Sequence, residues 1–131
     1  MNLYLIRHAI AEEESPAVED RLRALTEKGS KKMRNIAKGL KTLGLEFDYI
    51  ISSPYVRAQQ TAEILGDVFK LRKRIVISES IAPMGDPSQL LAEINEKYTV
   101  NSLAIVGHEP YLSNLISLLT TGGAPLEMTF K

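Results

Sequence analysis

The sequence predicts an α/β fold, a three-layer sandwich in which helices cover both faces of a mainly parallel central sheet. Short apolar segments alternate with amphipathic segments of helical periodicity along the whole chain, which is typical of strands joined by helices. The short segments are apolar on both faces, as strands are when helices bury the sheet from two sides. The alternation and the continuous apolar runs together predict this fold class.

The chain begins with a strand and, after a polar loop, a helix. Residues Asn2–Ile6 form a short apolar run, which predicts a buried strand. Residues 9–25 are polar, and Thr26 is suited to cap the next helix, because its hydroxyl accepts a hydrogen bond from a free N–H of the first turn. Gly44 fits the position just beyond the end of that helix. The apolar stripe of the helix is Met33, Ile36, Ala37, Leu40 and Leu43.

A second strand and helix follow directly. The run "FDYIISS" (47–53) predicts the strand, and Ser53 and Pro54 are expected to be the N-cap and first residue of the helix. Proline suits that place because it has no N–H to leave unpaired. The apolar stripe of this helix is Val56, Ala62, Ile64, Leu65 and Phe69.

The remainder of the chain repeats the strand–helix pattern. The run "RIVIS" (74–78) predicts a third strand, and Asp86-Pro87 begins a helix with apolar residues at helical spacing. The aliphatic run "SLAIVG" (102–107) predicts a fourth strand, and Pro110–Leu119 a fourth helix. The final residues, "LEMTFK" (126–131), resemble the beginning of a strand. We therefore expect one domain over residues 1–131 that lacks its C-terminal strands.

Composition narrows the classes of function. The formal net charge is zero, so broad attraction to nucleic acid or to an anionic membrane is not expected. The chain has no cysteine, which excludes disulfides, zinc–thiolate sites and a cysteine nucleophile. No segment approaches the roughly 20 apolar residues of a membrane span. A soluble cytoplasmic protein is the expectation.

Charged residues follow three of the predicted strands. Arg7 and His8 end the first strand, Arg57 lies in the first turn of the helix after the second, and His108 follows the fourth. In an open α/β sheet, ligands bind outside the carboxyl ends of the strands. These four side chains are therefore expected to meet at one edge of the sheet.

Arginine and histidine in this combination indicate phosphoryl transfer. The guanidinium group matches phosphate oxygens and stays charged, and histidine can form a covalent intermediate. Each residue alone has an ordinary structural explanation: a histidine at a strand end is usually a loop residue, and Arg7 could pair with an acidic residue in 12–14. The convergence of three junctions favours a phosphate site. Two histidines without close carboxylates make a poor metal site, and no cofactor is implied.

Three segments resemble the signatures of the histidine phosphatase superfamily. The segment "LIRHAIAEE" (5–13) resembles the Arg-His-Gly signature, with Ala9 in place of the usual glycine. The segments "IISSPYVRAQQTA" and "VGHEP" match the second and third signatures. Within the superfamily, "EDRLRALTEKG" is similar to small phosphohistidine phosphatases of the SixA type. The resemblance implies the phosphoglycerate mutase-like form of the α/β sandwich. The larger phosphoglycerate mutases of this superfamily carry a helical insertion between the third and fourth strands, whereas only a short segment separates Glu79 from the fourth strand here. The resemblance therefore implies a comparatively open site.

The resemblance also implies roles. His8 would be the nucleophile that becomes phosphorylated, with Arg7, Arg57 and His108 around the transferred phosphoryl group. In the mechanism that we hypothesise, His108 is protonated, on condition that an acid such as the adjoining Glu109 offsets the nearby cations. Arg23, in the Arg-Ala-Leu-Thr segment, would touch phosphate or substrate, although Arg21 is an alternative.

The general acid is left open by the sequence. Glu79 stands where the superfamily's acid would be, and Asp20 is a weaker candidate. An alcohol leaving group usually needs such an acid, whereas a phosphohistidine needs it less, because a proton on its second ring nitrogen already makes imidazole a good leaving group. If Glu79 is remote from His8, phosphohistidine is favoured as substrate.

The resulting hypothesis is a metal-free phosphatase. It would dephosphorylate a phosphohistidine-bearing signalling protein, such as a phosphotransfer domain, through its own phosphohistidine intermediate. A small-molecule phosphomonoesterase and a non-catalytic phosphate-binding adaptor are the alternatives.

Overall fold

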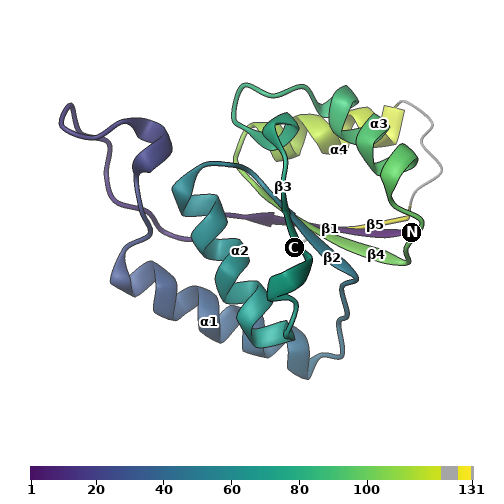
Figure 1. Ribbon diagram of the computed structural model, residues 1–131, viewed down its shortest axis with the longest axis horizontal. Helices are drawn as coiled ribbons and strands as arrows, with labels where there is room; N and C mark the ends of the chain where they lie inside the picture. Colours follow the sequence, from purple (N-terminus) through teal and green to yellow (C-terminus); the bar gives the residue numbers. More distant parts are fainter. Residues whose placement is uncertain (122–126, 131) are drawn as a thin grey trace.

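A parallel five-stranded sheet forms the centre of the protein, whose computed structural model describes residues 1–121 and 127–130 (Figure 1). The strands lie in the order β3-β2-β4-β1-β5, and every described pair is parallel. Their bounds are β1 Asn2–Arg7, β2 Tyr49–Ser52, β3 Ile75–Ile77, β4 Ser102–Gly107 and β5 Glu127–Phe130. The sheet and the helices on its two faces confirm the predicted fold class.

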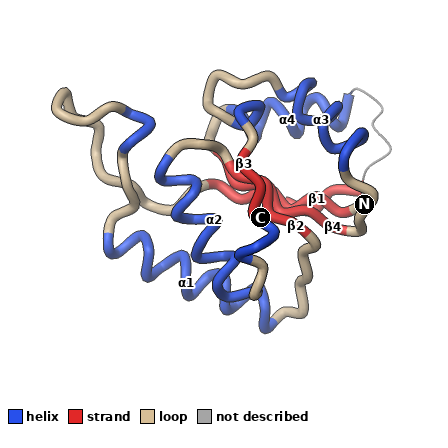
Figure 2. The backbone as a smooth tube through the Cα atoms, in the orientation of Figure 1, coloured by secondary structure: helices blue, strands red, loops and turns tan. Residues whose placement is uncertain are grey.

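Two helices cover each face of the sheet. Helices α1 and α2 lie against one face and α3 and α4 against the other, as the ribbon and the backbone tube both show (Figures 1 and 2). Their bounds are α1 Glu27–Thr42, α2 Val56–Phe69, α3 Pro87–Lys97 and α4 Tyr111–Thr121. Short 3₁₀ turns occur at η1 Asp20–Leu22, η2 Arg72–Arg74 and η3 Glu79–Ile81. Among the described helices, none combines the length and apolarity that crossing a bilayer would require.

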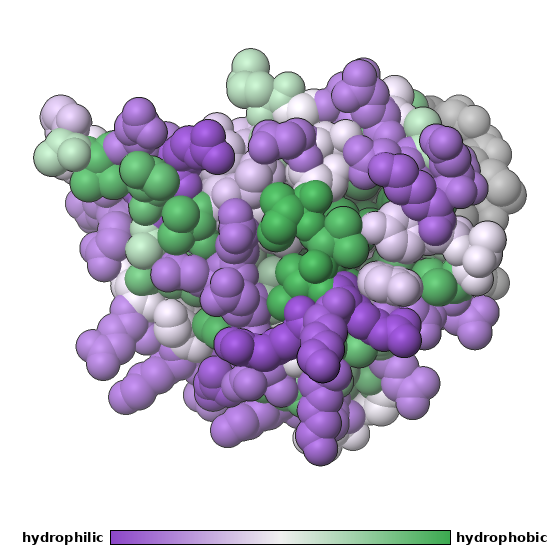
Figure 3. All heavy atoms as spheres, in the orientation of Figure 1, coloured by the Kyte–Doolittle hydropathy of each residue, from purple (hydrophilic) through white to green (hydrophobic). Residues whose placement is uncertain are grey.

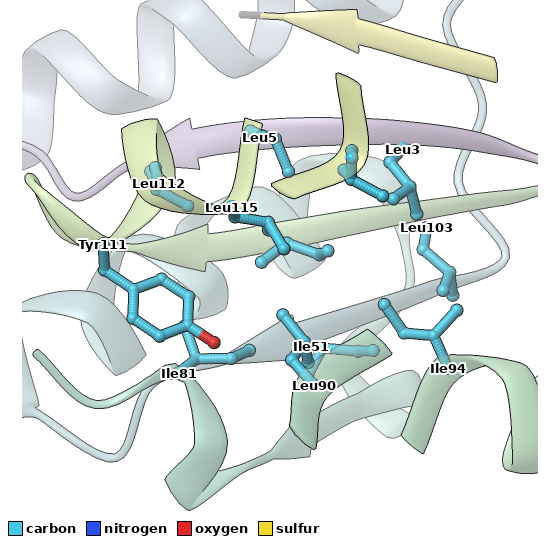
Figure 4. Close-up of a cluster of buried hydrophobic side chains, with 12 residues drawn as sticks. Leu3, Leu5, Ile51, Ile81, Leu90, Ile94, Leu103, Tyr111, Leu112 and Leu115 are labelled. Carbon is cyan, nitrogen blue, oxygen red and sulfur yellow. The ribbon is translucent and has the colours of Figure 1, made fainter. Parts of the chain in front are cut away.

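Alternation along the strands divides the interior into two cores. In β1, Leu3 and Leu5 belong to the core under α3 and α4, whereas Tyr4 and Ile6 belong to the core under α1 and α2. Figure 4 shows the first core, where side chains from β1 and β4 meet Leu90 of α3 and others from both helices. Each fully buried leucine or isoleucine contributes about 1.5–3 kcal/mol to folding, so the two cores hold the strand ends in place.

The beginning of α2 differs from the prediction. The helix starts at Val56 with Tyr55 as its N-cap, not with Ser53 and Pro54 in the first two places. The hydroxyl of Ser53 accepts a hydrogen bond from the N–H of Tyr55 at 3.2 Å, so it stabilises the turn before the helix. Its backbone N–H donates to Val106 at 3.0 Å, which extends the pairing of β2 with β4. Ser53 therefore belongs to the end of the sheet.

The two ends of α1 confirm the predicted signals. Thr26 caps the helix by accepting a hydrogen bond from the N–H of Gly29 at 2.8 Å. Gly44 follows the helix with a φ of 85°, a left-handed conformation that glycine adopts without strain.

The final strand was predicted within 126–131 and is observed at Glu127–Phe130 beside β1. Residues 126 and 131 lie outside the described part of the chain. The single domain over 1–131 and its missing C-terminal strands remain predictions.

The long loop between β1 and α1 projects beyond the sheet (Figure 2). It folds back on the first turn of α1, where the carbonyl of Ile10 accepts a hydrogen bond from Thr26 N–H at 2.9 Å. A β-carbon at Gly29 would lie 2.2 Å from that carbonyl oxygen. The absence of a side chain at Gly29 therefore allows the loop to approach the helix.

We expect Gly29→Ala to lower the free energy of unfolding, because the new methyl group meets backbone that cannot move without shifting the loop. A loss of about 1–3 kcal/mol is expected from such overpacking, measured by chemical denaturation. Gly39→Ala in the same helix is the matched control, since a β-carbon there meets nothing within 4 Å. This second change should raise stability by about 0.5–1 kcal/mol. Equal effects of the two substitutions would contradict the explanation.

Candidate active site

A cavity of about 790 Å³ opens at the carboxyl edge of the sheet. Side chains reach it from the end of β1, the first turn of α2, the residue after β4 and the loop before α1. Strand β4 lies between β1 and β2, which brings these segments together although they are far apart in sequence. The predicted residues that line the cavity are Arg7, His8, Asp20, Arg23, Arg57 and His108.

His8 is held in one orientation by bonds at both ring nitrogens. Its Nδ1 lies 2.8 Å from the carbonyl oxygen of Ala9, and Arg57 Nε lies 3.3 Å from its Nε2. Because the carbonyl oxygen can only accept a hydrogen bond and the guanidinium N–H can only donate one, we assign the proton of the ring to Nδ1 and its lone pair to Nε2. Burial, followed by the charges of Arg57 and Arg7, lowers the pKa of His8 despite the opposing effect of the Ala9 carbonyl. The ring is therefore neutral and nucleophilic at pH 7.

Arg57 is a buried cation with an anchored head group. The residue is 5% exposed, and its guanidinium lies 5.0 Å from the ring centroid of Tyr55. Besides contacting His8, it donates to the backbone oxygen of Asp20 at 2.6 Å and to the Asp20 carboxylate at 3.2 Å. The η1 turn thus balances the charge of Arg57 and fixes the direction of its donors.

Asp20 joins two arginines at the mouth of the cavity. Its carboxylate also accepts from Arg23, at 2.8 Å from Nε and 2.7 Å from the second terminal nitrogen. Burial alone would raise the pKa of Asp20, but the hydrogen bonds from Arg23 and Arg57 together hold it below its usual range. An ionised carboxylate of this kind is a poor general acid. Its position instead suits it to orient the two arginines.

His108 lies in the most enclosed part of the site. The residue is 2% exposed, and its ring centroid is 5.2 Å from that of His8 and 5.2 Å from that of Tyr55. Burial, followed by the proximity of His8 and Arg57, lowers the pKa of His108 to about 4. In the site without an anion the ring is therefore neutral at pH 7, and the protonated His108 hypothesised for the phosphoryl-bound site stays a prediction.

The acidic neighbour of His108 does not offset this shift. Glu109 instead accepts hydrogen bonds from the backbone N–H of Ser113, at 3.1 Å, and from the Ser113 hydroxyl. Its carboxylate is thus committed to the first turn of α4. A bound phosphate dianion would supply the negative charge that favours a protonated ring.

The remaining predicted residues lie in different surroundings. Arg7 is the exposed last residue of β1 and lines the cavity. Of the two arginines around η1, Arg23 lines the cavity and Arg21 is not among the lining residues. Glu79 begins η3 with an exposed side chain, and it too is outside the described lining. Its role as the general acid stays a prediction.

Sequence reasoning missed a contact of Ser53. Its hydroxyl lies 2.7 Å from His108 Nε2, but the Ser-Pro pair was sufficiently explained by helix capping. The residues that contact each other are 55 positions apart, and only the pairing of β2 with β4 could have indicated the contact. Lys32 of α1 also lines the cavity and was not singled out.

The donor groups of the site do not cluster as metal ligands. Within residues 1–121 and 127–130, no group of three or more His, Asp or Glu side chains is placed to hold a metal ion. The cations of Arg7, Arg57 and Arg23 line the cavity and supply positive charge for an anion. Arginine forks with directed N–H groups bind tetrahedral oxyanions well. The cavity is therefore chemically suited to a phosphoryl group beside a nucleophilic nitrogen.

Comparison with known proteins supports the same chemistry. A family model described as histidine phosphatase superfamily (branch 1) matches residues 3–85. An uncharacterised protein of Picosynechococcus is 36% identical over 133 residues, covering 100% of this chain and 80% of that protein. The phosphohistidine phosphatase SixA of Escherichia coli K12 is 31% identical over 129 residues, covering 95% and 78%. A solved structure of SixA complexed with tungstate is 29% identical, covers 98% and 83% of the two chains, and superposes with a TM-score of 0.79.

The pKa of His108 predicts how stability depends on pH. The unfolded chain takes up a proton on this ring near 6.5, whereas the folded chain does so only near 4, so the unfolded state binds more protons between these values. Lowering the pH from 7 to 5 should therefore reduce the free energy of unfolding by about 2 kcal/mol through His108, measured by urea denaturation. His8, whose pKa is also lowered, acts in the same direction.

His108→Gln is the control, because glutamine does not titrate. In this variant the loss of stability between pH 7 and pH 5 should shrink to the part due to His8 and the rest of the chain. An unchanged pH dependence would contradict the assignment to His108.

Proposed function

This chain belongs to the histidine phosphatase superfamily as a SixA-type phosphatase, and from this premise we propose that it dephosphorylates phosphohistidine on a signalling protein such as a phosphotransfer domain. The reaction passes through phosphohistidine on His8 and uses no metal ion. The observation that supports this most is the pair of bonds at His8, which put the proton on Nδ1 and the lone pair on Nε2, where it accepts a hydrogen bond from Arg57 at the cavity. A neutral imidazole with this lone pair is a nucleophile for phosphorus.

In the first step, His8 Nε2 attacks the phosphorus atom of the substrate. The new N–P bond forms as the bond from phosphorus to the substrate's ring nitrogen breaks, and the bonding pair returns to that nitrogen. Arg7 and Arg57 bind the equatorial oxygens, where charge is spread in the transition state. His8 keeps its Nδ1 proton on the Ala9 carbonyl, 2.8 Å away, so phosphorylated His8 carries a cationic ring.

In the second step, water attacks the phosphorus of phosphorylated His8. The P–O bond forms, the N–P bond breaks and its pair returns to Nε2, which restores the neutral ring. The proton of the water passes to the phosphate and then to solvent. Both steps thus break a P–N bond to a ring that is protonated on its other nitrogen, and neither needs a separate general acid to make imidazole a good leaving group.

This chemistry favours phosphohistidine over phosphate esters as the substrate. An alcohol is a poor leaving group without a proton donor. Asp20 is held ionised by two arginines, and Glu79 is not among the described residues lining the cavity. A substrate that brings its own ring proton suits this set of residues.

The rim of the cavity supports a protein rather than a small molecule as the carrier of the phosphoryl group. Ile10 and Ile36 line the cavity, yet are 47% and 50% exposed. Leu22 of η1 is 53% exposed, and apolar side chains gather on the projecting loop at the left of Figure 3. Exposed apolar residues beside a polar site are typical of contact with another protein. The proposal therefore includes a cytoplasmic location.

Covalent catalysis predicts that His8 can be trapped with a phosphoryl group. Wild-type protein mixed with a ³²P-labelled phosphohistidine protein and quenched in alkali should carry acid-labile label. His8→Ala should carry none and should lose at least about 10³-fold in turnover, since the nucleophile is absent. Undiminished label in His8→Ala, or no label on the wild type, would contradict covalent catalysis by His8, and a wild type without label or turnover would favour a non-catalytic adaptor. Turnover should be unchanged in excess chelator.

The proposed substrate class predicts that the protein turns over phosphohistidine faster than a phosphate ester. Phosphate release from a phosphohistidine phosphotransfer domain should exceed release from an alkyl phosphate ester by about 10²-fold in kcat/KM, because the departing alcohol lacks the ring proton that assists departure of imidazole. Glu79→Gln should leave the reaction with phosphohistidine within about threefold of wild type. Efficient turnover of the ester alone would instead show a small-molecule phosphomonoesterase.

A further inference from the structure

A buried hydrogen bond connects the end of β2 to His108. Ser53 Oγ lies 2.7 Å from His108 Nε2, and Ser53 is 0% exposed. The other ring nitrogen of His108, Nδ1, is buried and has no partner among the described residues. His108 lines the cavity, whereas Ser53 is not among its lining residues. The Nε2 side of the ring is thus bonded to Ser53, and Nδ1 is the ring nitrogen of His108 that has no described partner.

The direction of the hydrogen bond between Ser53 and His108 follows from where the proton of the Ser53 hydroxyl can be donated. Ser53 Oγ already accepts a hydrogen bond from the N–H of Tyr55 at 3.2 Å. His108 Nε2 is the one described acceptor for the Ser53 proton. If Nε2 carried a proton instead, the hydroxyl would lose its acceptor in a site without solvent, which costs about 1–3 kcal/mol. The hydroxyl therefore donates to Nε2.

We infer that Ser53 is a positioning residue, which holds neutral His108 in the tautomer with its proton on Nδ1, so that this N–H donates a hydrogen bond to an oxygen of the transferred phosphoryl group. The opposite tautomer would present a lone pair to an anion and repel it. His108 thereby serves the phosphoryl group as a neutral donor, and a proton gained on anion binding is not required for that contact. This role rests on the proposed function for its catalytic effect but not for the tautomer itself.

The neighbouring serine is a matched control. Ser52 is also 0% exposed, and its hydroxyl donates to the backbone oxygen of Ser53 at 2.9 Å. The two residues share the same strand end, size and burial, but of the two hydroxyls only that of Ser53 is hydrogen-bonded to His108 in the described structure. Substitution of Ser52 by alanine therefore reproduces the loss of a buried hydroxyl without changing the partner of the ring.

The tautomer can be measured by ¹⁵N NMR of the free protein. The chain has two histidines, so a His8→Gln variant assigns the two imidazole patterns. In the wild type at pH 7, His108 should show a protonated Nδ1 and an unprotonated Nε2, and titration with inorganic phosphate should shift the Nδ1–H signal. In Ser53→Ala the pattern should move toward a protonated Nε2, while Ser52→Ala should retain the wild-type pattern.

Kinetics measure the consequence for the reaction. Ser53→Ala should lower kcat by about 10- to 100-fold, somewhat less than the complete removal of a donor to the transition state. Ser52→Ala should stay within about threefold of wild type, and Ser53→Thr, which keeps a hydroxyl, should recover most of the loss.

Two results would overturn the inference. One is a wild-type His108 with its proton on Nε2, which the spectrum shows whatever the physiological substrate is. The other is an equal loss of kcat in Ser53→Ala and Ser52→Ala, which would reduce Ser53 to a structural role. Failure of the proposed function alone would leave the tautomer and its response to inorganic phosphate unchanged.

Discussion

The parallel pairing of β4 with β1 on one side and β2 on the other is the constraint on which the site depends. His8 N–H donates to Gly107 and Ser53 N–H donates to Val106, both at 3.0 Å, so the ladders continue past the strand ends into the cavity wall. Both faces of β4 are buried, since its side chains alternate between the two cores. A shift of β4 by one residue would exchange these faces, so the cores that stabilise the fold also hold His108 beside His8.

Charge balance is the second feature that organises the site. Arg7, Arg23 and Arg57 surround a neutral His8, and cations in such number would repel one another without a compensating anion. Asp20 supplies that anion from η1 by bonding to Arg23 and Arg57. Burial and, after it, the same arginines lower the pKa of His8, which keeps its lone pair unprotonated. One set of cations therefore both binds the phosphoryl group and maintains the nucleophile.

Local signals in the sequence predicted most of the elements, because caps and apolar periodicity act over a few residues. Thr26 and Gly44 bound α1 as their chemistry requires. The start of α2 was misplaced, since Ser53 and Pro54 satisfy the local rules for a helix start as well as those for a strand end. The bond from Ser53 to His108 and the fold of η1 over Arg57 depend on segments distant in sequence, and no local rule could predict them.

The sequence by itself determined the residue types and their order: a strand ending in Arg7 and His8, a helix beginning near Arg57, and a strand followed by His108. It also placed these residues at the carboxyl edge of a parallel sheet, because strand direction follows from alternation with helices. Only the tertiary structure decided the protonation of the site. Burial and the nearby cations make His108 neutral, and the Ala9 carbonyl determines which nitrogen of His8 carries the lone pair. Proton positions depend on distances of a few ångströms across the sheet edge, and these arise only when the two cores have packed.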